Sequence, residues 1–308
     1  MTPSQFGLSE KPICAKHNYG ITETHIGDGF LQAFSFEAIR DPTHGRVNYV
    51  NEYTAHQEGL LNTTADSLIL RADSWTELRS DGPGRNSFRL KSNRKYQTSV
   101  MVFDIRHMPQ GCGTWPAVWT VGDDWPNQGE LDILEGVNDQ SPNQVTIHTN
   151  QGCVMPPNRN QTGTSSGDNC DVYATNNAGC GVKLNDNRSY GPTFNENGGG
   201  WIAVERTQEY AKAWFWPRDG NPPHEIRRGA QHVNPDSWGT PGAHFPSTSG
   251  CDLGSKFGPQ SIVINRGDWA GSVYSSSGCP STCENFVNSH PEAFVSAYFD
   301  IGSLRIYE

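Results

Sequence analysis

The sequence of 308 residues is short of charged side chains and of long apolar runs. Asp, Glu, Lys and Arg make up 18% of it, against about 25% in an average soluble domain. No apolar run approaches the ~18 residues of a transmembrane helix. The N-terminal stretch MTPSQFGLSEKPIC has neither the basic nor the apolar region of a secretion signal. We therefore expect no membrane-spanning segment.

Positive charge is scarce as well. The 23 Lys and Arg residues are outnumbered by 33 Asp and Glu, which gives a net charge of −10. Proteins that bind a phosphate backbone carry clustered Lys and Arg, and this sequence has no dense run of either. We expect no nucleic-acid partner.

Glycine, proline and aromatic residues are abundant, with 33 Gly, 20 Pro, nine Trp, ten Tyr and 13 Phe. This composition favours strands joined by turns. Short β-rich segments recur between turn signals, at residues 29–37, 46–50, 67–72, 87–91, 98–105, 130–135, 144–148, 201–206, 212–216, 261–265 and 296–307. Their density predicts an all-β antiparallel sandwich.

Two stretches depart from the strand pattern. Residues 151–200 are rich in Gly, Asn, Thr and Cys, which is typical of long loops. Because β-rich segments lie on both sides, we interpret this stretch as an insertion and predict a single domain over residues 1–308. Segment 284–294 predicts one short helix, interrupted before Pro291.

Eight cysteines lie in loop-like sequence. An even number in this setting favours disulfides, although the sequence leaves their pairing open. Zinc is the alternative, but no cysteine pair has the CxxC spacing of a zinc site. Glycosylation sequons occur at Asn62, Asn160 and Asn187. We expect a secreted glycoprotein whose signal peptide is not present in this chain.

The most informative stretch is GELDILEG, in which Glu130, Asp132 and Glu135 alternate with apolar residues. On a regular strand Glu130 and Asp132 share one face, whereas Glu135 would point into the core. Burying a lone charge is expensive. One extra residue at Ile133 or Leu134, forming a β-bulge, would return Glu135 to the face of the other two acids.

Three acids on one face predict a retaining glycosidase. Glu130 would attack the anomeric carbon, and Glu135 would act first as acid and then as base. Asp132 would orient Glu130, and charge on Glu130 together with apolar and aromatic walls would raise the pKa of Glu135. The alternatives are a solvated edge strand, which does not explain the tryptophans crowded just upstream, and a Ca²⁺ loop, whose ligand spacing is missing.

A polysaccharide cleft needs flat aromatic side chains beside hydrogen-bonding groups. Trp115, Trp119, Trp125 and Trp269 are candidates, although core packing is the alternative for each. We favour Trp125, in a Pro/Asn/Asp loop, over Trp119, on an apolar strand. His148, on the following predicted strand, lies within reach of the acid/base.

These motifs resemble a known family. GELDILEG resembles the E-x-D-x-x-E signature of glycoside hydrolase family 16. With GTWPAVW and WPNQGE before it and VTIHT after it, the chain is similar to the fungal laminarinases, the endo-β-1,3(4)-glucanases of that family. The similarity covers nearly the whole chain, through DPTHGRVNYV, NAGCGV, SYGPTFN, SWGTPGAHFP and GDWAG.

The resemblance implies a concanavalin A-like jelly roll of two curved antiparallel sheets, with the glucan across the concave one. It implies a retaining reaction, with Glu130 as nucleophile and Glu135 as acid/base. Other positions that match the family's cleft are Asp132, Trp115, Trp125, His148, Trp269, Arg89 and Asn48. A few residues and one cysteine of the family pattern are missing just before GDWAG.

We therefore predict a secreted, monomeric endo-glucanase that cleaves β-1,3 bonds, and also β-1,4 bonds next to β-1,3 linkages. Its partner would be a β-glucan, and the chemistry would need no cofactor or metal. Two alternatives stay open: a glucan-binding lectin without activity, and a cell-wall transglycosylase on the same fold.

Overall fold

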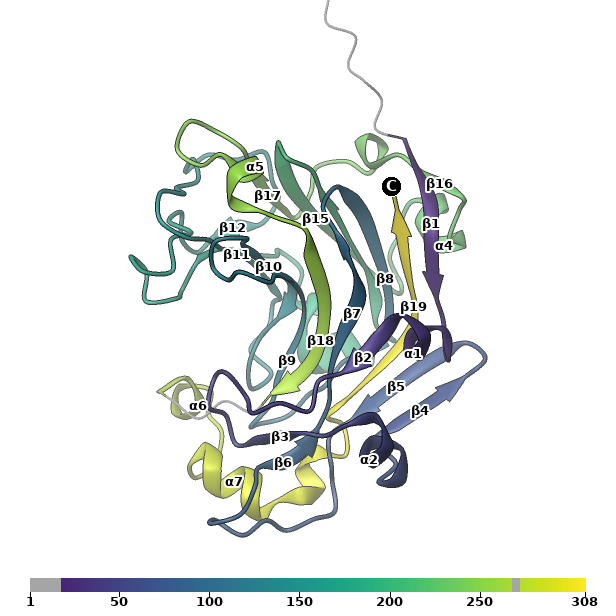
Figure 1. The fold of residues 1–308 in the computed structure, drawn as a ribbon, viewed down its shortest axis with the longest axis vertical. Helices are drawn as coiled ribbons and strands as arrows, with labels where there is room; N and C mark the ends of the chain where they lie inside the picture. The colour runs from purple at the N-terminus through teal and green to yellow at the C-terminus, as the bar shows by residue number, and fades with distance from the viewer. Residues whose placement is uncertain (1–17, 268–271) are drawn as a thin grey trace, which may run out of the picture.

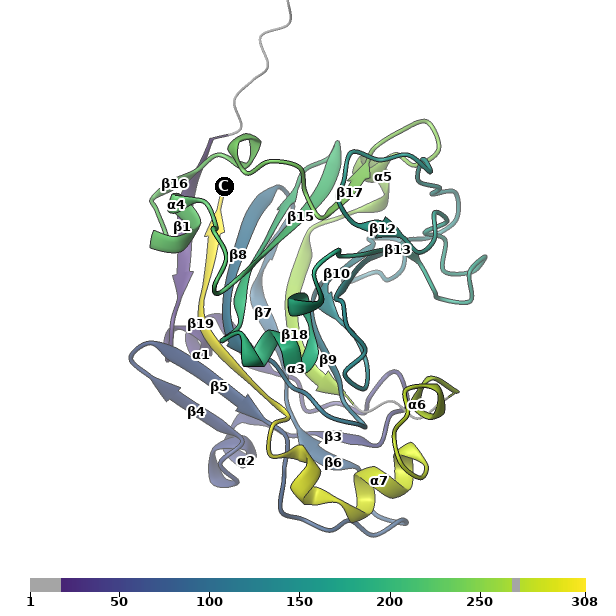
Figure 2. The ribbon, with the colours of Figure 1, turned by 180° about the vertical axis from the view of Figure 1, so that it is seen from behind.

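The computed structural model describes residues 18–267 and 272–308. Two antiparallel sheets are stacked face to face, and both are curved (Figure 1 and, from behind, Figure 2). The helices are short and lie at the edges and ends of the sheets. This is the antiparallel sandwich that the sequence predicts.

Over those residues the larger sheet has nine strands, in the order β16–β1–β19–β8–β14–β15–β17, with β5 beside β19 and β4 beside β5. Their bounds are β1 Tyr19–His25, β4 Leu61–Thr64, β5 Ser67–Arg71, β8 Ser99–His107, β14 Gly200–Arg206, β15 Tyr210–Pro217, β16 His232–Val233, β17 Ala243–Pro246 and β19 Tyr298–Tyr307.

The smaller sheet has eight strands in the same part of the chain, in the order β12–β13–β11–β10–β9–β18–β7–β2. Their bounds are β2 Phe34–Phe36, β7 Arg89–Tyr96, β9 Trp115–Gly122, β10 Glu130–Glu135, β11 Gln144–His148, β12 Thr164–Ser165, β13 Cys180–Lys183 and β18 Gln260–Gly267. Its strands bend around the open side of the molecule (Figure 1).

The remaining elements are a parallel strand pair and short helices. β3 Val47–Tyr49 pairs with β6 Arg85–Ser87. The α-helices are α1 Gly29–Ala33, α2 Glu52–Gln57, α3 Gly191–Glu196, α4 His224–Arg228, α5 Leu253–Lys256, α6 Ser272–Ser276 and α7 Cys283–Ser289. Single 3-10 turns span Asn187–Ser189, Pro235–Ser237 and Pro291–Phe294.

The main core lies between the two sheets. β14 shows how one strand serves two apolar clusters: Ile202 and Val204 face this core, whereas Trp201 and Ala203 face a second cluster on the outer side. Because both faces of β14 are covered, its sequence is almost continuously apolar. That residues 1–308 form one domain remains a prediction.

The predicted strand at 29–37 is wrong in its first half. Residues 29–33 form α1, and only β2 follows as strand. Phe30 and Phe34 are four residues apart and both are buried, with ring centroids 5.8 Å from each other. A spacing of four residues fits one face of a helix, but it also fits the alternation of a strand. Over so short a segment the sequence pattern does not distinguish the two. The short helix predicted at 284–294 is present as α7 and the turn after Pro291.

Three disulfides settle the pairing of six cysteines: Cys112–Cys279, Cys153–Cys251 and Cys170–Cys180. Two of them hold the loop-rich stretch 151–200, as the composition suggests. Cys283 is buried, and Cys14 lies outside the described residues. β18 is formed up to Gly267 despite the residues missing before GDWAG.

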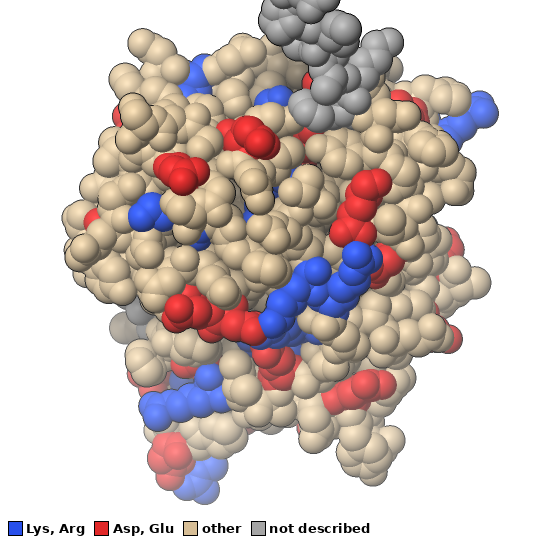
Figure 3. All heavy atoms as spheres, turned by 45° about the horizontal axis from the view of Figure 1, so that its top comes forward, with Lys and Arg blue, Asp and Glu red and all other residues tan. Residues whose placement is uncertain are grey.

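Charges of both signs are mixed on the surface. On the face in Figure 3, Lys and Arg side chains lie close to Asp and Glu, and most of the area is uncharged. Arg94, for instance, pairs with both Glu23 and Glu308. Among the described residues, no helix has the length and apolar character needed to cross a membrane.

Candidate active site

A cleft of about 1280 Å³ lies on the concave face of the smaller sheet. Strands β7, β9, β10, β11 and β18 contribute side chains to it, and so do loops at 41–43, 140–142 and 176–178. It exceeds the ~300–1,000 Å³ of a typical small-molecule site. A ligand of several linked units fits this size better than a single small molecule.

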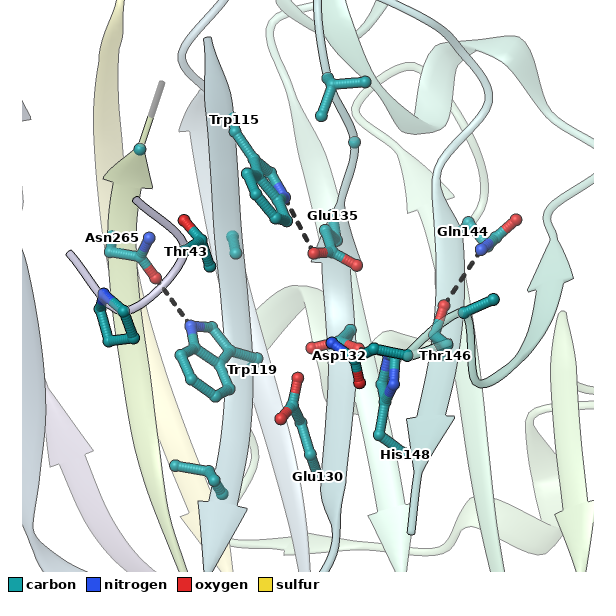
Figure 4. A pocket seen from close by; sticks show the side chains of 18 of the residues that line it. Thr43, Trp115, Trp119, Glu130, Asp132, Glu135, Gln144, Thr146, His148 and Asn265 are labelled. Atoms are coloured by element: carbon teal, nitrogen blue, oxygen red, sulfur yellow. Dashed lines mark hydrogen bonds and ion pairs between the residues drawn. The ribbon is translucent and has the colours of Figure 1, made fainter. Parts of the chain in front are cut away.

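The β-bulge predicted in GELDILEG is present. β10 pairs with β9 through Asp132↔Trp119 and then Leu134↔Val118, so that Ile133 is the extra residue. Ile133 and Leu134 are both buried in the core. Glu130, Asp132 and Glu135 all face the cleft, with Asp132 between the two glutamates (Figure 4).

Glu135 is half-buried and lies beside an indole. Its Oε1 accepts a hydrogen bond of 2.9 Å from Nε1 of Trp115. Burial raises the pKa of Glu135, while the Trp115 N–H and the charge of His148 act against this rise. The predicted rise is therefore present, and its main cause is the apolar and aromatic surroundings that the sequence indicates.

Glu130 and Asp132 belong to the same electrostatic group. Burial raises the pKa of each well above its usual value, and repulsion from Asp132 and Glu135 adds to the rise at Glu130. Asp132 is hydrogen-bonded to Glu130. Three carboxyls grouped in this way, with Asp132 buried and both glutamates half-buried, cannot all be ionised cheaply, so that they share at least one proton.

His148 lies on β11 directly opposite Glu130. Its Nε2 is 3.2 Å from Oδ2 of Asp132, and this is its contact in the site. Its place on the following strand predicts that it reaches the acid/base, but it acts on Glu135 through charge and not through a hydrogen bond.

Trp119 is a cleft residue that the sequence reasoning ranked below Trp125. Trp115, Ala117 and Trp119 line the cleft together, because alternate residues of a strand share one side. The indole Nε1 of Trp119 donates to Asn265 at 2.7 Å. The two-residue spacing from Trp115 is the signal that could have identified it.

Arg89 and Trp125 line the cleft as expected. The guanidinium of Arg89 lies 5.1 Å from the ring centre of Trp119, and its Nε donates to Glu37 at 2.8 Å. Trp125 is 43% exposed, and its indole acts to lower the pKa of Glu130. An exposed indole face at the cleft is suited to stacking on a sugar ring.

The expectation for Asn48 is not supported. Asn48 is not among the residues that line the cleft. Its Nδ2 donates to Oδ1 of Asn86 at 2.6 Å, and Asn86 in turn donates to Glu58. The neighbouring Tyr49 lines the cleft instead, because successive side chains of a strand point to opposite sides. Trp269 lies outside the described residues.

Glu130, Asp132 and His148 also offer ligand atoms within 4.8 Å of one another, which is close enough to hold a metal ion. That the protein works without a cofactor remains a prediction.

The family model described as the XgeA-like catalytic GH16 domain matches residues 34–307. The chain belongs to glycoside hydrolase family 16. This confirms the resemblance seen in GELDILEG, and the enzyme class is that of a glycoside hydrolase.

Curated relatives in this family come from fungi. A probable glycosidase of Schizosaccharomyces pombe is 43% identical over 96% of this chain and 71% of its own length. The endo-1,3(4)-β-glucanase of Emericella nidulans is 39% identical over 96% of this chain and 48% of its own length. The chain therefore spans less than half of the latter protein.

Two solved structures of family 16 are similar along their whole length. Laminarinase 16A of Phanerochaete chrysosporium, solved with two β-glucans in its donor and acceptor sites, is 51% identical with a TM-score of 0.92. An elongating family 16 β-1,3-glucosyltransferase is 42% identical with a TM-score of 0.87. Each covers 94% of this chain and is itself fully covered. These matches confirm the predicted jelly roll.

Proposed function

We propose that this family 16 domain hydrolyses internal β-1,3 bonds of glucans, and β-1,4 bonds next to β-1,3 linkages, with retention of configuration. The observation that carries the proposal is the bulge at Ile133, which brings Glu130 and Glu135 to one face of an aromatic-lined cleft. The named activity of the Emericella relative and the β-glucans bound to the Phanerochaete laminarinase support the substrate class.

In the first step, the Glu130 carboxylate attacks the anomeric carbon from the face opposite the bond that breaks. Glu135, whose pKa is raised by burial, gives its proton to the leaving glycosidic oxygen. A covalent glycosyl-enzyme forms, and the shortened chain leaves. Asp132 holds Glu130 by a hydrogen bond and keeps a proton within the acid group.

In the second step, Glu135 is ionised and takes a proton from water. The water oxygen attacks the anomeric carbon, and the bond to Glu130 breaks. Two inversions at one carbon give retention overall. Stacking on Trp119 and Trp125 would hold the sugar units beside the acids.

A chemical-rescue experiment tests these roles. Glu130→Ala with azide should regain part of its activity on an activated aryl β-laminaribioside. It should release an α-glycosyl azide, because azide enters the space left by the carboxylate. Glu135→Ala with azide should release the β-azide, because the glycosyl-enzyme still forms. A β-azide from the first variant would contradict the assignment of the nucleophile.

Transglycosylation is the second candidate, favoured by the similarity to an elongating β-1,3-glucosyltransferase. The same glycosyl-enzyme would then be attacked by a sugar hydroxyl instead of water. Incubation with laminari-oligosaccharides at high concentration separates the two. If longer oligomers are the main products, transglycosylation and not hydrolysis is the principal activity.

A glucan-binding lectin has less support, because binding alone gives no reason for three coupled acids in the cleft. A mechanism-based epoxide glycoside should label Glu130 in stoichiometric amount. Absence of labelling in folded protein that binds laminarin would favour the lectin.

We further propose that the protein is secreted, glycosylated and monomeric. The three disulfides suit an oxidising compartment. Asn62, Asn160 and Asn187 are all exposed, as glycosylation requires. Mass spectrometry before and after deglycosylation of protein from the culture medium, with light scattering for the mass in solution, tests these points.

A further inference from the structure

The bulge in β10 leaves backbone groups that the neighbouring strand does not pair. β10 pairs with β11 at Glu130↔His148, Leu131↔Ile147 and Asp132↔Thr146, and the pairing stops there. The next three residues, which include the bulge and Glu135, lie beyond that ladder on this side. A buried N–H or C=O without a partner costs about 1–3 kcal/mol, so that something else must satisfy them.

The side chain of Asn143 fills that place. Its Oδ1 accepts from the backbone N–H of Glu135, and its Nδ2 donates to the backbone C=O of Ile133, each at 2.9 Å. One amide thus bonds to both sides of the bulge, as an adjacent strand would. Asn143 is completely buried and is the residue just before β11.

The backbone of Asn143 is hydrogen-bonded to a segment on the side away from the bulge. Its backbone N–H donates to Oγ of Ser189 at 3.0 Å, and that hydroxyl donates to the backbone C=O of Asp186 at 2.6 Å. Its C=O accepts from the N–H of Leu184 at 3.0 Å. The backbone of Asn143 is therefore held by the segment 184–189, and the side-chain amide extends from it to the bulge. None of these bonds involves the acids of the cleft.

We propose that Asn143 is a positioning residue for the general acid: it holds the bulge that turns Glu135 into the cleft. The inference rests on the proposed function, because it assigns Asn143 a role through Glu135. It touches the backbone of Glu135 and not the reacting atoms. Without the amide, the strand would regain its regular alternation or leave Glu135 without a fixed orientation.

The test compares substrates that do and do not need an acid. Asn143→Ala should lose about 100-fold in kcat/KM on laminarin, the order expected when an acid is displaced by about 1 Å. On a 2,4-dinitrophenyl β-laminaribioside, whose leaving group needs no proton, the loss should stay within about 5-fold, because Glu130 remains in place. Thermal unfolding would establish that the variant is folded.

Asn195 supplies a matched control. Its amide also bridges one backbone N–H and one C=O, both of Met108, the residue just after β8, and each at 2.9 Å. Asn195→Ala should lower stability without separating the two substrates. Should Asn143→Ala not fold, Asn143→Asp is measured instead, since it keeps the acceptor for Glu135 and loses the donor to Ile133.

Failure of the positioning role and failure of the proposed function give different results. An equal loss on both substrates for the folded Asn143 variant, with a clear separation for Glu135→Gln, would overturn the positioning role alone. Equal losses for both variants would remove Glu135 as the acid and with it the proposed function.

Discussion

Two buried acidic sites in this molecule look alike in sequence and differ in what surrounds them. Glu205 on β14 and the acids of β10 both lie on apolar strands. Glu205 is fully buried, and it accepts hydrogen bonds from Tyr19 at 3.0 Å and Tyr210 at 2.9 Å, with Lys212 3.8 Å away. Two tyrosine hydroxyls and one lysine therefore surround this carboxyl group.

The acids of β10 lie beside one another, with the indole of Trp115 at Glu135 and the imidazole of His148 at Asp132. Burial and mutual repulsion raise the pKa of Glu130 and of Asp132, and burial raises that of Glu135. The comparison teaches that burial alone does not make a catalytic acid. A buried acid with stabilising partners is structural, whereas one held against other acids keeps a proton that chemistry can use.

The largest expected effect separates activity from stability. Glu130→Gln should lower kcat on laminarin by at least about 10⁴-fold, because no nucleophile remains. The same change removes a charge from a crowded acid group, so that the melting temperature should stay the same or rise. Calorimetry beside a reducing-sugar assay measures both. A clear fall in melting temperature would place Glu130 in the structural class of Glu205.

Glu135→Gln should have the next largest effect. Loss of the general acid should cost about 10²–10⁴-fold on laminarin, and far less on an aryl glycoside with a good leaving group. The ratio of kcat/KM on the two substrates is the measurement. An unchanged ratio would argue that Glu135 is not the proton donor.

Glu205→Ala should lower stability and leave activity almost unchanged, which is the reverse of what is expected for the acids of β10. It leaves two buried tyrosine hydroxyls without their acceptor, at about 1–3 kcal/mol each. The melting temperature should fall by several degrees, while kcat at 25 °C stays within about 2-fold of wild type. If activity falls and the melting temperature does not, Glu205 is not a structural acid, and its contrast with the acids of β10 is lost.

The smallest expected effect concerns pH. The Trp115 N–H lowers the pKa of Glu135 by stabilising its carboxylate. In Trp115→Phe this pKa should rise, and the acid should stay protonated to higher pH. The alkaline limb of kcat/KM should therefore move upward by about 0.5–1 pH unit. Trp119→Phe is the control, since its N–H bonds to Asn265, and a similar shift there would contradict the assignment.

Much of this site could be predicted from local sequence. The alternation of acids with apolar residues in GELDILEG required a bulge, and the bulge lies at Ile133. What failed was of a different kind. The family resemblance places Asn48 in the cleft, and the apolar neighbours of Trp119 favour the core, whereas the face that each side chain presents depends on pairing with other strands.

The residues that hold the site were also beyond reach from sequence. Asn143 precedes a strand in an unremarkable loop, and its role follows only from the ladder that ends beside it. Likewise, no spacing rule pairs Cys153 with Cys251, which are 98 positions apart.

The amino-acid order by itself determined the all-β class, the acid group and the need for an irregular strand, because side-chain alternation is a property of a single chain segment. Only the tertiary structure decided which aromatic rings line the cleft, which cysteines pair and why Glu135 keeps its proton. Those depend on removal from water and on partners that are brought together by pairing between distant strands.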